Sequence, residues 1–155
     1  MATATARISN RDEQDVDEMS ETPDFGDHVD NTIFSQLLEM DDDDERDFSG
    51  PLVENFFEQA DETFVNMDLA LTKKDLEELS KLGHFLKGSS STLGFNKIRD
   101  SCQIIQQYGH KLNVDGSDEK DEKVCLTKIE AAIQVAKVDK KELEKLMNDF
   151  FGKAK

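Results

Sequence analysis

Residues 95–112 read FNKIRDSCQIIQQYGHKL. Apolar or small side chains recur in this stretch at steps of three, four, three, four and three residues, the most regular spacing in the chain. The members of the series are Phe95, Ile98, Cys102, Ile105, Gly109 and Leu112. This spacing follows the repeat of an α-helix and places the whole series on one face. The stretch therefore predicts an amphipathic helix that buries one side.

The rest of the sequence beyond residue 30 shows similar apolar stripes. We expect further helices over 32–40, 49–71, about 72–94 and about 119–138, with a short last helix over 143–150. Ser49 is a suitable N-cap for its helix, and Pro51 fits the first turn. Wide stripes separated by short breaks favour antiparallel packing. The predicted fold class is all-α: an up-down antiparallel four-helix bundle with an additional N-terminal helix and a C-terminal helical extension.

The negative charge of the chain is concentrated near its N-terminus. The formal net charge is −16, and residues 1–50 hold 16 acidic and 3 basic side chains. Residues 1–30 are polar and lack apolar periodicity, so we expect a disordered acidic tail followed by one folded domain over 31–155. The acidic excess disfavours binding to nucleic acid or to anionic membranes. No apolar run is long enough to span a bilayer.

His84 lies on the polar face of the helix expected over 72–94. On a helical wheel it falls roughly opposite the leucine stripe, and Lys87, Gly88 and Ser91 share its face. A lone histidine is more often structural, but a glycine inside a helix costs about 1 kcal/mol relative to alanine. Gly88 stands four residues after His84, and its lack of a side chain leaves room beside the ring. An exposed imidazole with space and a nearby cation suits a phosphoryl group bound to a ring nitrogen.

The stretch HFLKGSSSTLG, residues 84–94, closely resembles the signature of histidine-containing phosphotransfer (HPt) domains. The residues around 40–49 are similar to the region before the second helix of fungal, budding-yeast-type HPt proteins. Together with the helix order, the resemblance covers about residues 31–112. It implies a four-helix bundle with one phosphorylatable histidine in a multistep phosphorelay. The phosphoryl group would come from the receiver aspartate of a hybrid sensor histidine kinase and pass to response-regulator aspartates, in osmotic or oxidative stress signalling.

The resemblance also assigns roles by position. It makes His84 the phosphoacceptor, Lys87 the neutralising cation and Gly88 the residue that gives access. It places Ser89 near the site and makes Gln106 the residue that hydrogen-bonds the imidazole. It further implies a receiver-docking patch formed by Ile33, Phe34, Leu37, Met40, Phe48 and Leu52, with Asp41 and Asp44 at its rim.

The resemblance implies a phosphoryl carrier rather than an enzyme. We expect no cofactor of its own, because the catalytic aspartate and its Mg²⁺ belong to the partner's receiver domain. The expected partners are the receiver domain of a hybrid histidine kinase and response regulators. We expect a monomer, and the small size and the lack of a targeting signal suggest both cytoplasm and nucleus.

Other patterns in the sequence favour simpler interpretations. The acidic run 41–44 lacks the glycine and the spaced glutamate of a calcium-binding loop, so we expect no metal site. Cys102 and Cys125 lie on or beside apolar stripes, which predicts burial rather than redox chemistry. The alternative function is a non-catalytic helical adaptor that binds receiver domains. A kinase with its own nucleotide site is disfavoured because the sequence has no Gly-rich nucleotide-binding region.

Overall fold

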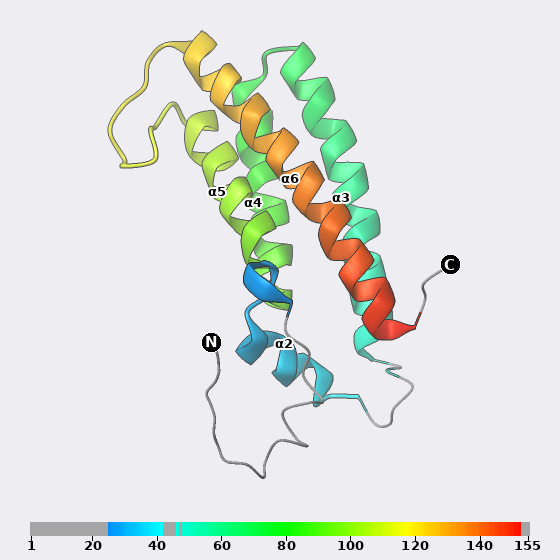
Figure 1. Cartoon of the computed structure of the whole chain (residues 1–155). Helices are drawn as coiled ribbons and strands as arrows, with labels where there is room; N and C mark the ends of the chain where they lie inside the picture. The colour runs from blue at the N-terminus through cyan, green and yellow to red at the C-terminus, as the bar shows by residue number, and fades with distance from the viewer. Residues whose placement is uncertain (1–24, 42–45, 47, 153–155) are drawn as a thin grey trace.

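The computed structural model describes residues 25–41, 46 and 48–152. In this part of the chain, five α-helices follow one short 3₁₀ helix. They are η1 (Gly26–His28), α2 (Asn31–Leu38), α3 (Ser49–Thr72), α4 (Leu76–Leu93), α5 (Asn96–Gly109) and α6 (Glu122–Phe151). The four longest helices run side by side, and α2 lies across one end of them (Figure 1). The predicted all-α bundle with an additional N-terminal helix is confirmed.

The four bundle helices pack in a closed ring. Helix α3 contacts α4, α4 contacts α5, α5 contacts α6, and α6 returns to α3. The stripe that begins at Phe95 faces the centre, where Phe95, Ile98, Cys102 and Ile105 are fully buried. Because the helices bury their apolar stripes against one another, their polar faces point outward and are available for chemistry.

The C-terminal part of the bundle differs from the prediction. Instead of one helix to residue 138 and a second short one, α6 runs unbroken from Glu122 to Phe151. No glycine or proline interrupts the charged turn between them. The buried stripe continues in phase through this turn, because Ala136, Leu143 and Met147 all face the core. Lys140 supports the turn by pairing with Asp61 of α3 at 2.8 Å.

The bundle helices begin and end at recognisable caps. Helix α4 begins at Leu76, later than expected, because the Asp75 carboxylate accepts a hydrogen bond from the Glu78 N–H at 3.0 Å and fixes the first turn. It ends at Gly94, which has the left-handed φ of 79° that favours glycine. This turn lets α5 fold back against α4 directly.

Folded structure begins before residue 31. Phe25 and Val29 are buried, and Val29 forms a bridge with Phe95 at the start of α5. His28, which the charge pattern assigned to the acidic tail, is also buried, with its Nε2 3.1 Å from Glu142 Oε1 of α6. Residues 25–30 therefore belong to the folded domain, while the rest of the expected tail, residues 1–24, lies outside the described residues.

Helices α4 and α5 approach each other closely at two glycines. A Cβ on Gly109 would lie 2.7 Å from Ser80 Cβ and 2.8 Å from Ser80 N. A Cβ on Gly83 would lie 3.0 Å from the carbonyl oxygen of Cys102 and 3.1 Å from the amide nitrogen of Gln106. Side chains at these positions would push the two backbones apart. The short separation governs which side chains of α4 and α5 can meet at the surface.

Candidate functional site

His84 projects from the middle of α4 and is exposed, as the helical wheel predicts. The Nδ1 atom of its ring lies 3.3 Å from the side-chain nitrogen Nε2 of Gln106 on α5. Gln106 is half-buried. Because Gly83 packs against α5, the backbone of Gln106 lies close to α4. The amide therefore holds one edge of the imidazole ring.

The three histidines of the chain differ in what their Nε2 atoms contact. The Nε2 of His28 faces Glu142 at 3.1 Å, and that of His110 faces Ser80 Oγ at 2.9 Å. The Nε2 of His84 has no hydrogen-bond partner among the described residues, whereas its Nδ1 faces Gln106. His84 is thus the histidine whose ring is oriented by one nitrogen and open at the other.

Lys87 is half-buried one turn after His84 on α4. Its ammonium donates a hydrogen bond of 2.9 Å to the side-chain oxygen Oε1 of Gln103, one turn before Gln106 on α5. The cation is therefore held on the same face as the open imidazole. Nothing in the sequence indicated that Gln103 binds the lysine.

Gly88 and Ser89 complete the surface beside the histidine. A Cβ on Gly88 would meet nothing within 4 Å, so the space expected at this position is present. Ser89 is half-buried and lines a shallow groove of about 300 Å³ between α3 and α4. Leu37 and Leu52 line the same groove, which thus connects the histidine-bearing helix to the predicted docking patch.

The structure places most of the predicted docking patch at the surface. Met40, Phe48 and Leu52 are 61%, 41% and 37% exposed. Ile33 and Leu37 are half-buried. These side chains offer an apolar surface that this chain alone does not cover.

Phe34 is a correction to the predicted patch. It is fully buried, so it cannot contact a partner. Its ring packs edge-on against Phe25 at a centroid distance of 5.5 Å and against Phe150 at 6.0 Å. Both partners lie outside α2, so the helical pattern of α2 could not indicate this burial. Phe34 anchors α2 to the end of the bundle.

Sequence reasoning missed one exposed aromatic residue at the site. Phe85 follows His84 directly and is 50% exposed. The available signal was its place on the wheel, because residue 85 falls away from the leucine stripe of α4. Its position next to the histidine makes it a further apolar contact for any partner that approaches the ring.

Asp41 is the second correction, because its side chain is 1% exposed and does not form the rim of the patch. Its Oδ1 accepts hydrogen bonds from the N–H groups of Phe48 at 2.9 Å and Ser49 at 2.8 Å. Its Oδ2 accepts one from Ser49 Oγ at 2.6 Å. Asp41, not the predicted Ser49, therefore caps α3, whose N-cap residue is Phe48. Asp44 lies outside the described residues.

The environment of Asp41 favours its charged form. Burial acts to raise the pKa of this carboxyl group, but the hydrogen bonds from Ser49 and from the Phe48 backbone outweigh it. The Arg46 guanidinium, 3.7 Å from Oδ2, acts in the same direction. The net result is a lowered pKa.

The remaining reactive groups in the described residues have structural surroundings. Burial raises the pKa of the Cys102 thiol to about 12, which disfavours the reactive thiolate, and Cys125 is also buried. His28, Asp139 and Glu142 bring possible metal ligands within 4.8 Å of one another. The hydrogen bond between His28 and Glu142 at 3.1 Å already accounts for their contact without a metal ion.

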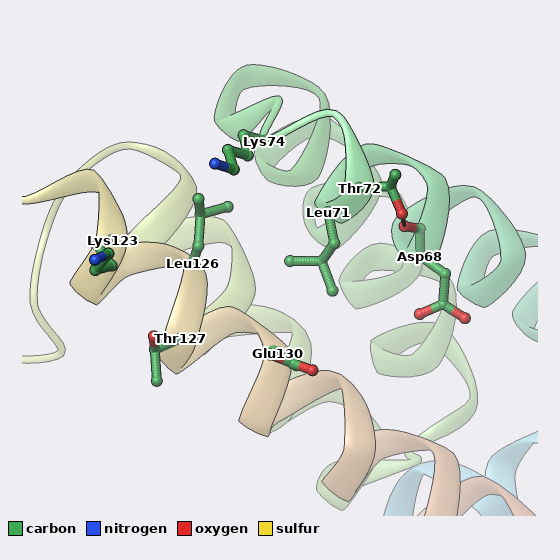
Figure 2. Close-up of a pocket in the computed structure, with 8 residues that line it drawn as sticks. All are labelled: Asp68, Leu71, Thr72, Lys74, Lys123, Leu126, Thr127 and Glu130. Carbon is green, nitrogen blue, oxygen red and sulfur yellow. Dashed lines mark hydrogen bonds between the residues drawn. The ribbon is translucent and has the colours of Figure 1, made fainter.

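Another groove is lined by residues from the C-terminal end of α3 through Lys74 and from the first turns of α6 (Figure 2). Its volume is about 440 Å³. It combines Lys74 and Lys123 with Asp68 and Glu130, and Asp68 already pairs with Lys137 at 2.8 Å. None of its lining residues is a histidine, so this groove offers no second imidazole.

The fold and the site together define a class of protein. A family model of the Hpt domain matches residues 51–148, which is more than half of the chain. The chain therefore belongs to the Hpt domain family.

Several fungal proteins are similar to this chain. Multistep phosphorelay regulator 1 of Schizosaccharomyces pombe is 44% identical over 126 residues, which cover 81% of this chain and 43% of the relative. Phosphorelay intermediate protein YPD1 of Candida albicans is 46% identical over 110 residues, covering 71% and 58%. The chain thus spans about half the length of these curated relatives.

A solved structure supports the same relationship. The Saccharomyces cerevisiae histidine phosphotransfer signaling protein Ypd1 was co-crystallised with the receiver domain of its downstream response regulator Ssk1. Its similarity to this chain has a TM-score of 0.72 at 31% sequence identity, covering 81% of this chain and 95% of the solved chain.

The cap formed by Asp41 gives a pH-dependent prediction. The pKa of Asp41 is lower in the folded protein than in the unfolded chain, so the carboxylate contributes its full stabilisation at pH values above the ordinary aspartate pKa. This stabilisation is lost as the pH falls through the lowered pKa of the folded state. We expect Asp41→Asn to reduce the free energy of unfolding by about 1–2 kcal/mol at pH 7. Urea unfolding from pH 7 to pH 3 should show the difference shrinking on acidification. Glu58→Gln, an exposed change on α3, serves as the control. If Asp41→Asn loses no unfolding free energy at pH 7, or loses the same amount at every pH, the role of the carboxylate is contradicted.

Proposed function

We propose that this chain is a histidine phosphotransfer protein of a multistep His-Asp-His-Asp phosphorelay. His84 accepts a phosphoryl group from the receiver aspartate of a hybrid sensor histidine kinase and passes it to response-regulator aspartates. The proposal rests mainly on the geometry of the His84 ring, whose Nδ1 faces Gln106 while its Nε2 is open. Membership of the Hpt family and the phosphorelay names of the fungal relatives support the proposal.

The open nitrogen supplies the nucleophile. The lone pair of Nε2 attacks the phosphorus of the receiver's aspartyl phosphate, a nitrogen–phosphorus bond forms, and the phosphorus–oxygen bond to the aspartate breaks. The electron pair of the broken bond stays on the departing carboxylate. The reverse set of bonds forms and breaks when the group passes to the next receiver. Such transfer depends mainly on alignment and charge neutralisation, so a few residues on an exposed helix suffice.

The Gln106 amide suits this step because it can serve either tautomer of the ring. It can donate from its nitrogen to Nδ1, or accept from Nδ1–H through its oxygen after the amide group rotates by about 180°. The second arrangement places the proton on Nδ1 and leaves the lone pair on Nε2. The Gln106 oxygen Oε1 has no hydrogen-bond partner among the described residues, so it is available for this bond.

In this proposal the protein is a phosphoryl carrier rather than an enzyme. Lys87 lies close enough to offset the added negative charge of phosphohistidine. The protein needs no cofactor of its own, since the catalytic aspartate and the Mg²⁺ that it holds belong to the receiver domain. The protein acts as a monomer in cytoplasm and nucleus, in the response to osmotic or oxidative stress.

The receiver domain docks on the apolar surface beside the histidine. Met40, Phe48 and Leu52 supply exposed side chains, and the groove that Leu52 shares with Ser89 leads toward the histidine-bearing helix. A buried apolar contact of this kind aligns the two reacting groups. With docking through this apolar contact, the residues around His84 do not themselves need to bind the receiver tightly.

Phosphotransfer from a labelled receiver domain tests the proposal directly. The wild-type protein with Mg²⁺ and a phosphorylated receiver should acquire acid-labile, base-stable label. His84→Gln should acquire none, and Gln106→Ala should be labelled more slowly, because its ring is no longer held. His110→Gln keeps His84 intact and is expected to match the wild type. Label on the His84→Gln protein would contradict the assignment.

The same assay separates the proposal from the adaptor alternative. A folded protein that binds receivers but takes up no label from several of them would be an adaptor. Circular dichroism confirms that each variant keeps its helices.

The docking surface has its own test. We expect the double variant Met40→Ala/Leu52→Ala to bind a receiver domain about tenfold more weakly, because two exposed apolar anchors are lost. Its thermal stability should change little, since both side chains are exposed. Val135→Ala removes a side chain of 53% exposure from α6 and is the matched control. Titration calorimetry measures the affinity, and equal binding by all three proteins would place the receiver elsewhere.

A further inference from the structure

The polar face of α4 meets α5 through two parallel side-chain pairs. His84 pairs with Gln106 at 3.3 Å, and Lys87 pairs with Gln103 at 2.9 Å. The residues on each helix are three positions apart, so both pairs lie one turn from each other along antiparallel helices. We refer to these two contacts as the amide ladder.

Both α5 members of the amide ladder are uncharged. The oxygen of Gln103 accepts a hydrogen bond from the Lys87 ammonium and so fixes its position. An amide oxygen carries no net charge and does not neutralise the ammonium. Among the described residues, no carboxylate lies within ion-pair distance of Lys87, whereas four other lysines form such pairs: Lys81, Lys111, Lys137 and Lys140.

From this geometry we infer that Gln103 is a positioning residue for phosphoryl transfer: it aims the Lys87 ammonium at the open side of His84 while leaving its positive charge uncompensated. The inference rests on the proposed function and adds to it the residue that orients the neutralising cation. A glutamate at this position would keep the hydrogen bond but cancel the charge. An apolar side chain would keep the charge but release the ammonium to other positions.

The first test is Gln103→Glu, which preserves shape and the hydrogen bond to Lys87. Negative charge beside the ammonium should disfavour a phosphoryl group on His84. We expect the equilibrium between phosphorylated receiver and phosphorylated His84 to shift about fivefold toward the receiver. Receiver affinity should stay unchanged, because the docking surface is intact. Gln134→Glu adds the same charge on an exposed part of α6 and should match the wild type.

A double-mutant cycle tests whether Gln103 acts through Lys87. Gln103→Met should slow transfer at saturating receiver in the wild-type background, because the ammonium is no longer held. In a Lys87→Met background the same change should have no further effect. Additive losses would show that Gln103 acts on its own, and would overturn the inference.

The outcomes for Gln103 are distinct from those for the proposed function. If the wild type takes no label, the proposed function fails. If the wild type is labelled and Gln103→Glu shifts the equilibrium no more than Gln134→Glu, the inference about Gln103 fails alone. Circular dichroism and thermal unfolding verify that the Gln103 variants are folded.

Discussion

The close approach of α4 and α5 is the constraint on which the site depends. Gly83 and Gly109 leave no room for a side chain between the two helices, since a Cβ at either position would press on the opposing backbone or on Ser80. Helices packed at ordinary separation would hold Gln103 and Gln106 farther from the face of α4. With the glycines in place, two short amide side chains reach the imidazole and the ammonium. The site is therefore built by backbone packing rather than by a pocket.

The end of the bundle also presents an apolar surface, where Met40, Phe48 and Leu52 are exposed. Phe34 buries its ring among Phe25, Phe95 and Phe150, and so fixes α2 across the helix ends. Asp41 closes the connection to α3 by capping its first N–H groups. These contacts leave other side chains of the same segment exposed beside the histidine-bearing helix. Phe34 and Leu38 of α2 thus pack into the core, while Met40, just beyond the helix, stays exposed.

The sequence predicted features that depend on local periodicity and missed those that depend on distant contacts. The apolar stripes identified the bundle, the wheel placed His84 on an exposed face, and the resemblance to the HPt family assigned Gln106 to the imidazole. The burial of Phe34 and the capping role of Asp41 depend on residues that meet only after folding, so no local pattern could reveal them. The unbroken α6 was predicted as two helices because a charged turn resembles a break. Gly109 belongs to the periodic series of α5, but that pattern predicts only burial and not the close contact with Ser80.

The central claim is that α5 holds one nitrogen of the His84 ring and leaves the other open. Nitrogen-15 NMR of the phosphorylated protein, with labelled histidine, tests this most directly, because the two ring nitrogens have distinct shifts and couplings to phosphorus. The account predicts phosphorus on Nε2 and a hydrogen-bonded Nδ1 whose shift changes in Gln106→Ala. Phosphorus on Nδ1 would show that Gln106 does not hold this edge of the ring, and would contradict the account.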